Sequence, residues 1–140
     1  MKQIAVIRHP FDVLASVRSS DGSELNDRQL QLRRELYLGI MNVIKSQSEG
    51  CHVIRYEDLI TNPFKELKAV LKYLGVKRDT LTVGKLVETA NMLVKSIPGH
   101  VTSGDVQQSV GRWKRDFDDK DLIRKFHYYF DDVIQELDYE

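Results

Sequence analysis

Four residues near the start of the chain, Arg8, Pro10, Asp12 and Ser16, have types and spacing that suggest anion binding. Ligands of open α/β sheets bind beyond the carboxyl ends of parallel strands, and Arg8 directly follows the apolar run at 4–7. Pro10 suits the first position of a helix, whose free N–H groups favour an anion. The planar guanidinium of Arg8 and the hydroxyl of Ser16 would join them. The spacing therefore predicts a phosphate site, in which Asp12 holds the Arg8 guanidinium without touching the ligand.

A simpler interpretation of the same residues needs no ligand. Arg8 and Asp12 could form an ion pair that braces a strand–helix turn, with Ser16 facing solvent. Both interpretations require a strand that ends near residue 8 and a helix that begins near Pro10. The residue types alone leave this choice open.

The hydrophobic periodicity predicts the elements that would position these residues. Residues 3–8 and 52–56 are typical of short strands, the first buried on both faces. A helix is expected from Pro10, a loop at 19–23, and helices at 26–48, from Pro63 to residue 74, at 82–96 and from about 119 to the end. Asn62 would cap the helix at Pro63, Gly75 would end it, and 97–109 would be a long loop. This order predicts an α/β fold with parallel strands joined by helical crossovers.

Each predicted helix has an apolar stripe that should face the interior. The residues expected to be buried are Val13, Leu14 and Val17; Leu30, Leu32, Leu36, Tyr37, Ile40, Met41 and Ile44; Phe64, Leu67, Leu71 and Leu74; Val83, Leu86, Val87, Ala90 and Leu93; and Leu122, Phe126, Phe130 (or Tyr129), Val133 and Leu137.

The composition narrows the class of protein. The chain has 140 residues, which predicts one domain over 1–140. Its 21 basic and 21 acidic residues argue against a general nucleic-acid binder. A single cysteine, Cys51, excludes an internal disulfide, and no metal site is expected. No apolar run is long enough for a membrane span and no signal peptide precedes the first strand, so a cytoplasmic protein is expected.

Three segments stand in order along the chain: VIRHPFDVLAS at 6–16, VIRYEDL at 53–59 and SVGRWK at 109–114. Together they resemble motifs of sulfotransferases that use 3′-phosphoadenosine 5′-phosphosulfate (PAPS). VIRHPFDVLAS at 6–16 is similar to the family's 3′-phosphate motif. VIRYEDL at 53–59, with the Asn62-Pro63 pair and YLG at 73–75, is similar to its second segment. SVGRWK at 109–114 is similar to the late segment that closes over the nucleotide. The resemblance covers nearly the whole chain and implies the family's three-layer, P-loop-like α/β fold with a short parallel sheet.

The resemblance also implies a cofactor and its contacts. The cofactor would be PAPS, or its product 3′-phosphoadenosine 5′-phosphate (PAP), with Arg8 and Ser16 on the 3′-phosphate. Further contacts would come from the later segments: Tyr56 and Thr89 near the adenine, and Ser109, Gly111 and Arg112 on the 3′-phosphate side. Trp113 would either shield the nucleotide or anchor the core.

Several features of the family pattern are missing from this sequence. The family's Gly-rich loop, which supplies a lysine to the leaving group, is not found, so the chain resembles the C-terminal part of a catalytic domain, truncated at its N-terminus. Its general-base histidine is not found either; among the four histidines present, His100 is the candidate to test. A basic residue expected before the late segment is replaced by Val106-Gln107-Gln108, where a neutral hydrogen bond would be roughly half as strong.

These observations support two main hypotheses. The first is a sulfotransferase-type domain that binds PAPS or PAP, for sulfuryl transfer to a hydroxyl or amine acceptor of unknown identity, with little turnover as an isolated chain. The second is a degenerate, non-catalytic nucleotide-binding or assembly domain of the same fold. Two predicted strands are too few for a sheet of this kind, and the edges left by the missing strands invite pairing with another chain. A homo-oligomer, or a partner chain that supplies the missing strands, is therefore expected. An unrelated α/β nucleotide binder is a third possibility.

Overall fold

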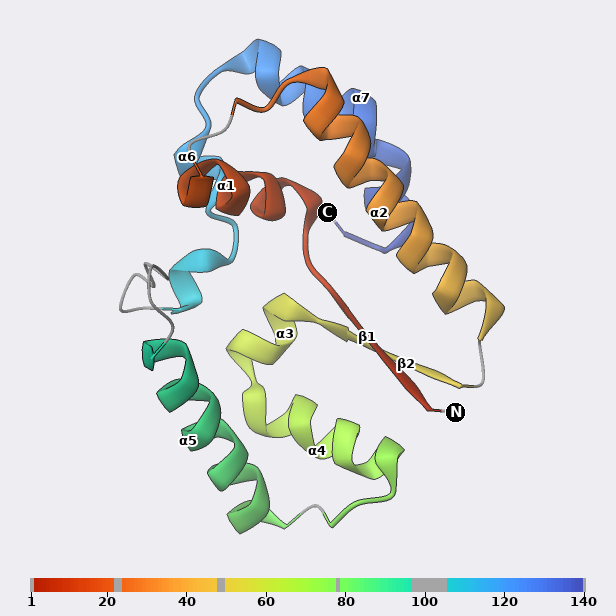
Figure 1. The fold of residues 1–140 in the computed structure, drawn as a ribbon, viewed down its shortest axis with the longest axis vertical. Helices are drawn as coiled ribbons and strands as arrows, with labels where there is room; N and C mark the ends of the chain where they lie inside the picture. Colours follow the sequence, from red (N-terminus) through yellow and green to blue (C-terminus); the bar gives the residue numbers. More distant parts are fainter. Residues whose placement is uncertain (1, 22–23, 48–49, 78, 97–105, 140) are drawn as a thin grey trace. The chain divides into compact units, whose positions relative to one another are not determined.

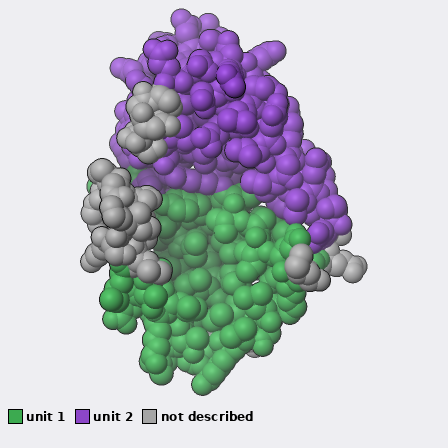
Figure 2. Space-filling model, in the orientation of Figure 1, with its two compact units in different colours: residues 1–7, 49–108 green, residues 8–48, 109–140 purple. Residues whose placement is uncertain are grey.

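A computed structural model describes residues 2–21, 24–47, 50–77, 79–96 and 106–139. The chain forms two compact units (Figure 2). Unit 1 comprises residues 1–7 and 49–108, and unit 2 comprises residues 8–48 and 109–140. None of the helices in the described ranges is both long and apolar enough to cross a membrane.

Unit 1 contains a short parallel sheet and three helices (Figure 1). Strand β1 (Gln3–Ile7) pairs in parallel with β2 (Cys51–Arg55), with Gln3 opposite Cys51. The helices are α3 (Tyr56–Thr61), α4 (Pro63–Leu74) and α5 (Thr80–Ser96). A 3₁₀ turn, η1, follows at Val106–Ser109, and its last residue belongs to unit 2. The structure is mostly helical with a two-stranded parallel sheet, which is compatible with the predicted α/β class.

The predicted burial of the first strand on both faces is wrong. Ile4 and Val6 of β1 keep 39% and 53% of their surface exposed, and Val53 of β2 keeps 38%. Among the described residues the sheet has two strands, so each strand is an edge and has only one neighbour. Ile7 and Ile54 are the strand residues that are buried.

Helix α4 ends as predicted at Gly75, which adopts a left-handed φ of 78° and donates its N–H to the carbonyls of Leu71 and Lys72. At its other end Asn62 occupies the N-cap position, as predicted, and its carbonyl accepts the N–H of Glu66 at 3.2 Å. Its side chain makes no capping bond, since its φ and ψ of −139° and 61° differ from the usual cap conformation.

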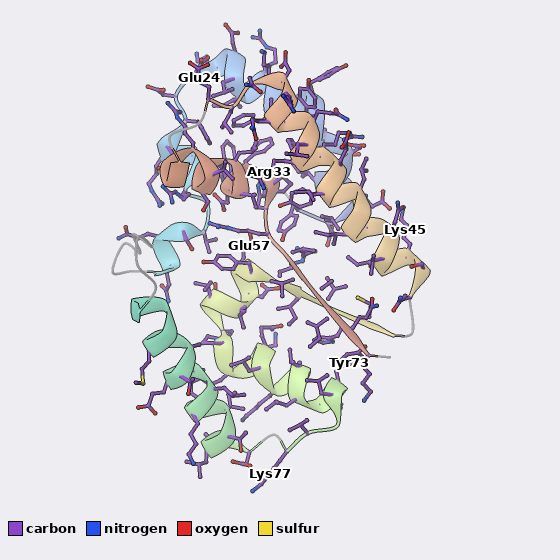
Figure 3. The ribbon with its side chains drawn as sticks, in the orientation of Figure 1. Glu24, Arg33, Lys45, Glu57, Tyr73 and Lys77 are labelled. Atoms are coloured by element: carbon purple, nitrogen blue, oxygen red, sulfur yellow. The ribbon has the colours of Figure 1, made fainter. Side chains whose placement is uncertain are left out.

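Tyr73, near the end of α4, ties this helix to the start of the sheet (Figure 3). Its hydroxyl accepts the N–H of Gln3 at 3.1 Å and donates to the carbonyl of Gly50. Its ring stacks on His52 with centroids 5.2 Å apart. The side of the helix that bears Tyr73 therefore faces the sheet.

The apolar stripes of unit 1 are narrower than the periodicity predicts. Leu71 and Val83 are buried as expected, whereas Phe64, Leu74 and Leu86 are exposed. Ala90 is also exposed, and the side chain of Leu93 lies outside the described part. A two-stranded sheet offers little surface to cover, so only the centre of each stripe finds a neighbour.

Asp79 caps the first turn of α5. Its carboxylate accepts the N–H of Thr82 at 2.9 Å and the Thr82 hydroxyl at 3.0 Å, and Lys77 lies 3.3 Å away. The backbone bond, then the hydroxyl bond, lower the pKa of Asp79 from 3.8 to about 2. A depressed carboxyl pKa stabilises the folded state at neutral pH.

We therefore expect the start of α5 to lose its cap in acid. The stabilisation is complete above the unfolded pKa of about 4 and is lost as the pH falls through the folded value of about 2. Amide exchange of Thr82, followed by NMR against pH, measures this loss. The quantity to compare is the protection factor of Thr82, that is, its exchange rate relative to the intrinsic rate at each pH. This factor should stay constant in the Asp79→Asn variant over the same range, and an equal pH response in both proteins would contradict the assignment.

Unit 2 consists of helices α1 (Pro10–Asp21), α2 (Asp27–Ser46), α6 (Trp113–Asp116) and α7 (Lys120–Glu136). Helix α1 continues through Asp21, so the predicted loop at 19–23 is wrong for residues 19–21, and residues 22–23 lie outside the described part. The core of this unit combines aromatic and aliphatic side chains, and its largest fully buried rings, Phe11, Phe126 and Phe130, have exposures of 1%, 0% and 0%. The predicted stripe of α7 is confirmed by the burial of Phe126, Phe130 and Val133.

Helix α2 packs on α7 through a different face from the one centred on Leu32 and Leu36. Those two leucines are 49% and 52% exposed, whereas Leu30, Tyr37 and Met41 are buried. The residues of this second set recur at seven and four, which places them on one helix face away from the leucines. Periodicity shows two overlapping apolar stripes here, and only packing decides between them.

A bidentate ion pair reinforces the contact between α2 and α7. The guanidinium of Arg34 bonds both carboxylate oxygens of Asp132 at 2.6 Å, and it also donates to the Tyr129 carbonyl at 2.6 Å. The hydrogen bond from Arg34 lowers the pKa of Asp132. This geometry fixes how α2 lies along α7.

Candidate anion-binding site

Helix α1 begins where the sequence predicts, and His9 caps it. The carbonyl of His9 accepts the N–H groups of Asp12 and Val13 at 3.0 and 3.2 Å. Its ring Nδ1 accepts the N–H of Phe11 at 3.2 Å. His9 is thus a structural cap, in agreement with its expected place in the turn. Ser16 lies further along the same helix and is half-buried.

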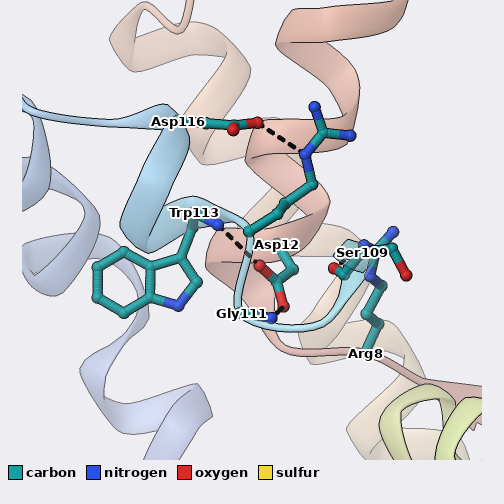
Figure 4. A network of polar contacts seen from close by, with 7 residues as sticks. Arg8, Asp12, Ser109, Gly111, Trp113 and Asp116 are labelled. Atoms are coloured by element: carbon teal, nitrogen blue, oxygen red, sulfur yellow. Dashed lines mark hydrogen bonds and ion pairs between the residues drawn. The ribbon is translucent and has the colours of Figure 1, made fainter. Parts of the chain in front are cut away.

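Arg8 is held at both its side chain and its main chain. The guanidinium Nη2 donates to the carbonyl of Ser109 at 2.7 Å, which joins residues 101 positions apart (Figure 4). The hydroxyl of Tyr37, on α2, donates to the carbonyl of Arg8 at 2.7 Å. The first and third sequence segments therefore meet within unit 2.

The spacing predicted that Asp12 holds the Arg8 guanidinium, and this prediction is wrong. Its carboxylate is 1% exposed and instead accepts two backbone N–H groups of the 109–113 segment (Figure 4). Oδ2 accepts from Gly111 at 2.7 Å, and Oδ1 accepts from Trp113 at 3.0 Å. The expected ion pair is replaced because the backbone N–H groups provide two well-aligned donors.

The backbone conformation of the 109–113 segment explains this contact. Gly111 has a left-handed φ of 68°, and Arg112 follows in the right-handed region at φ −62° and ψ −27°. A left–right pair of this kind turns successive N–H groups toward one concavity, called a nest, which favours an anion. In this protein the Asp12 carboxylate is the anion in the nest. Sequence reasoning missed this role, although a glycine two residues before Trp113 was a possible signal.

Trp113 anchors the segment in the core of unit 2. Its indole lies edge-on to Phe11 at 5.0 Å and parallel to the His9 ring at 6.0 Å. Beside it, the Arg112 Nε pairs with Asp116 at 2.7 Å. Of the two roles considered for Trp113, the structure shows the core anchor.

Two other predicted site residues belong to unit 1, and one lies outside the described residues. Tyr56 is the first residue of α3 and is half-buried, and Thr89 is exposed on α5; both belong to unit 1. His100 lies outside the described residues. His127 is exposed and pairs with Asp131 at 2.7 Å. In the described part of the chain, no group of His, Cys, Asp or Glu side chains is placed to hold a metal ion.

We expect Gly111→Ala to destabilise the protein by about 1–2 kcal/mol, because an L side chain at this φ of 68° is strained. A Cβ at Gly111 would meet no heavy atom within 4 Å, so strain and not collision is the cause. Urea unfolding followed by circular dichroism measures the change.

Gly39→Ala is the matched control. Gly39 lies within α2, and a Cβ there also meets nothing within 4 Å. Alanine in a helix interior should stabilise the protein by about 0.5–1 kcal/mol. Equal and favourable effects at both positions would contradict the strained turn at Gly111.

Comparison with known proteins identifies a related domain. A family profile described as "Sulfotransferase domain" matches residues 34–138, which is most of the chain. The match includes Tyr56, Thr89 and the 109–113 segment, and it begins after the Arg8–Ser16 stretch. No curated protein and no solved structure matches this chain.

Proposed function

Since the chain belongs to the sulfotransferase-domain family, we propose that it binds PAPS or PAP and grips the 3′-phosphate with Arg8 and Ser16. The observation that carries this proposal is the guanidinium of Arg8 held 2.7 Å from the Ser109 carbonyl, beside the start of α1. Tyr56 and Thr89 would contact the adenine, and the proposed fold is the family's P-loop-like α/β fold over residues 1–140.

The chemistry of the donors fits a phosphate group. A guanidinium presents a planar fork that matches phosphate oxygens, and a serine hydroxyl adds a neutral donor. Asp12 is the carboxylate closest in sequence to both groups. Both oxygens of Asp12 accept N–H groups of the 109–113 segment, so the nest compensates the negative charge of this carboxylate. Ser109 and Arg112 would close over the same side of the nucleotide.

When bound, PAPS supplies a sulfuryl group for transfer to a hydroxyl or amine. The residues of this chain would bind and orient the nucleotide through its 3′-phosphate and adenine. These 140 residues contain no Gly-rich loop followed by a lysine, which would stabilise charge on the leaving group. We therefore propose that this chain alone has little turnover, and incubation with labelled PAPS and simple acceptors tests this.

The alternative function is a non-catalytic assembly domain of the same family. Two observations favour it: Gln107 and Gln108 replace an expected cation, and Ile4, Val6 and Val53 leave apolar surface exposed on the strands. Light scattering tests the assembly, since a homo-oligomer is expected and a strict monomer would contradict it. An assembly domain without a nucleotide site would show no saturable PAP binding.

Binding of PAP against 5′-AMP is the deciding experiment. The two nucleotides differ by the 3′-phosphate, so PAP should bind at least about 10-fold more tightly, a difference of ~1.4 kcal/mol. Trp113 is the single tryptophan and lies in the 109–113 segment, so its fluorescence provides a second readout besides calorimetry. Equal affinities, or no saturable binding of PAP, would overturn the proposed 3′-phosphate site.

A further inference from the structure

We infer that Asp12 is a positioning residue for the 3′-phosphate site: its carboxylate fills the nest of the 109–113 segment and so fixes the backbone to which Arg8 is bonded. This inference rests on the proposed function. It assigns Asp12 a task different from bracing the arginine directly. Asp12 acts through Gly111 and Trp113 on Ser109, and through Ser109 on Arg8.

The first step is the bond between α1 and the nest. Asp12 lies in the first turn of α1, and its two oxygens reach Gly111 at 2.7 Å and Trp113 at 3.0 Å. These bonds join residues 99 and 101 positions apart. Helix α6 begins at Trp113, so the same carboxylate also caps that helix. One side chain thus fixes the backbone on both sides of Arg112.

The second step is the burial of the charge. Asp12 is 1% exposed, and a buried carboxylate is costly unless hydrogen bonds compensate it. In the described part of the chain it makes no ion pair, and its two bonds come from backbone N–H groups. Charge-assisted bonds of this kind are about twice as strong as neutral ones. The nest and the carboxylate therefore depend on each other.

The third step leads to the guanidinium. Ser109 lies two residues before Gly111, and its carbonyl accepts Nη2 of Arg8 at 2.7 Å. Tyr37 holds the main chain of Arg8 from α2, at 2.7 Å from the Arg8 carbonyl. If the nest is disturbed, the main chain of Arg8 keeps its anchor but the carbonyl that orients its side chain can move. The effect should then fall on recognition of the 3′-phosphate.

The Asp12→Asn variant tests this role, because asparagine has the same shape but turns one acceptor into a donor. One of the two N–H groups would then face an NH₂ group and lose its bond. We expect PAP affinity to fall by about 10-fold, while 5′-AMP affinity changes by less than about twofold. Hydrogen exchange of the Gly111 and Trp113 amides should accelerate in the free variant.

Asp119→Asn is the matched control in the same unit. Asp119 also accepts two backbone N–H groups, from Asp121 at 2.9 Å and Leu122 at 3.2 Å, where it caps α7. Both of these bonds go to Oδ1, which asparagine retains, so Asp119→Asn removes a carboxylate charge from the unit without the loss of either bond. Only Asp12→Asn should change the ratio of PAP to 5′-AMP affinity. An unchanged ratio in Asp12→Asn overturns the positioning role alone. Failure of the unmodified chain to bind PAP overturns the proposed function itself.

Discussion

The Arg8→Ala variant is expected to lose about 100-fold or more in PAP affinity, which corresponds to ~2.8 kcal/mol. Hydrogen bonds from a charged donor contribute roughly 1.5–3 kcal/mol each, and a guanidinium can give two of them to one phosphate. Affinity for 5′-AMP should change little, because that nucleotide lacks the group that Arg8 would bind. Calorimetry with both nucleotides measures the difference.

Two further variants separate charge from geometry. Arg8→Lys keeps the positive charge but removes the planar fork, so an intermediate loss is expected. Arg124→Ala removes an exposed guanidinium of α7, which pairs with Asp121 at 3.1 Å, and should leave PAP affinity within about twofold. If Arg8→Ala and Arg124→Ala weakened PAP equally, a general effect of net charge, and not a phosphate grip, would explain the result.

The longer helices and both strands could be predicted in order from the sequence, because local signals determine them, whereas the short helices α3 and α6 and the turn η1 were missed. Pro10, Pro63 and Gly75 mark element ends through fixed backbone preferences, and all three lie at such ends. The core stripe of α7 was also predicted, since its apolar residues recur on one face only. Helix α2 shows the limit: its leucines and its Tyr37 define competing faces, and the choice depends on α7, which is far away in sequence.

The candidate site, like the fold, could be predicted from the sequence only in part. The Arg8–Ser109 bond brings the first and third segments together, whereas the role in 3′-phosphate binding that the resemblance implies for both stays a prediction. The partners of Asp12 could not be predicted, since the nest exists only through the left-handed φ of Gly111. Residue types suggested a charge pair, because two opposite charges four residues apart are the simplest partners. Backbone donors compete with such pairs, and a sequence does not show where they point.

Phe11 connects the candidate site to the core of unit 2. It lies between Pro10 and Asp12 in the first turn of α1 and is 1% exposed. Its ring contacts Trp113 at 5.0 Å and Phe126 at 5.4 Å, centroid to centroid. The residue therefore packs α1 against both the 109–113 segment and α7. Loss of this ring should loosen the element that carries Asp12 as well as the core.

We expect Phe11→Ala to lower the free energy of unfolding by about 3–5 kcal/mol, because it removes a fully buried ring and leaves a cavity. This is a large part of the ~5–15 kcal/mol that typically stabilises a domain. Urea unfolding, followed by Trp113 fluorescence and circular dichroism, measures the change. Trp113 should become more exposed in the folded variant, since it loses an edge-on neighbour.

Two controls show whether the ring's place in the core is the cause. Phe11→Leu keeps an apolar side chain of intermediate volume and should be less destabilising than alanine. Tyr128→Ala removes an aromatic ring from α7 that is 84% exposed, and should change stability by less than about 0.5 kcal/mol. Similar losses for Phe11→Ala and Tyr128→Ala would mean that α1 is not packed as the structure shows. The 109–113 segment would then lack the support that the proposed phosphate site needs.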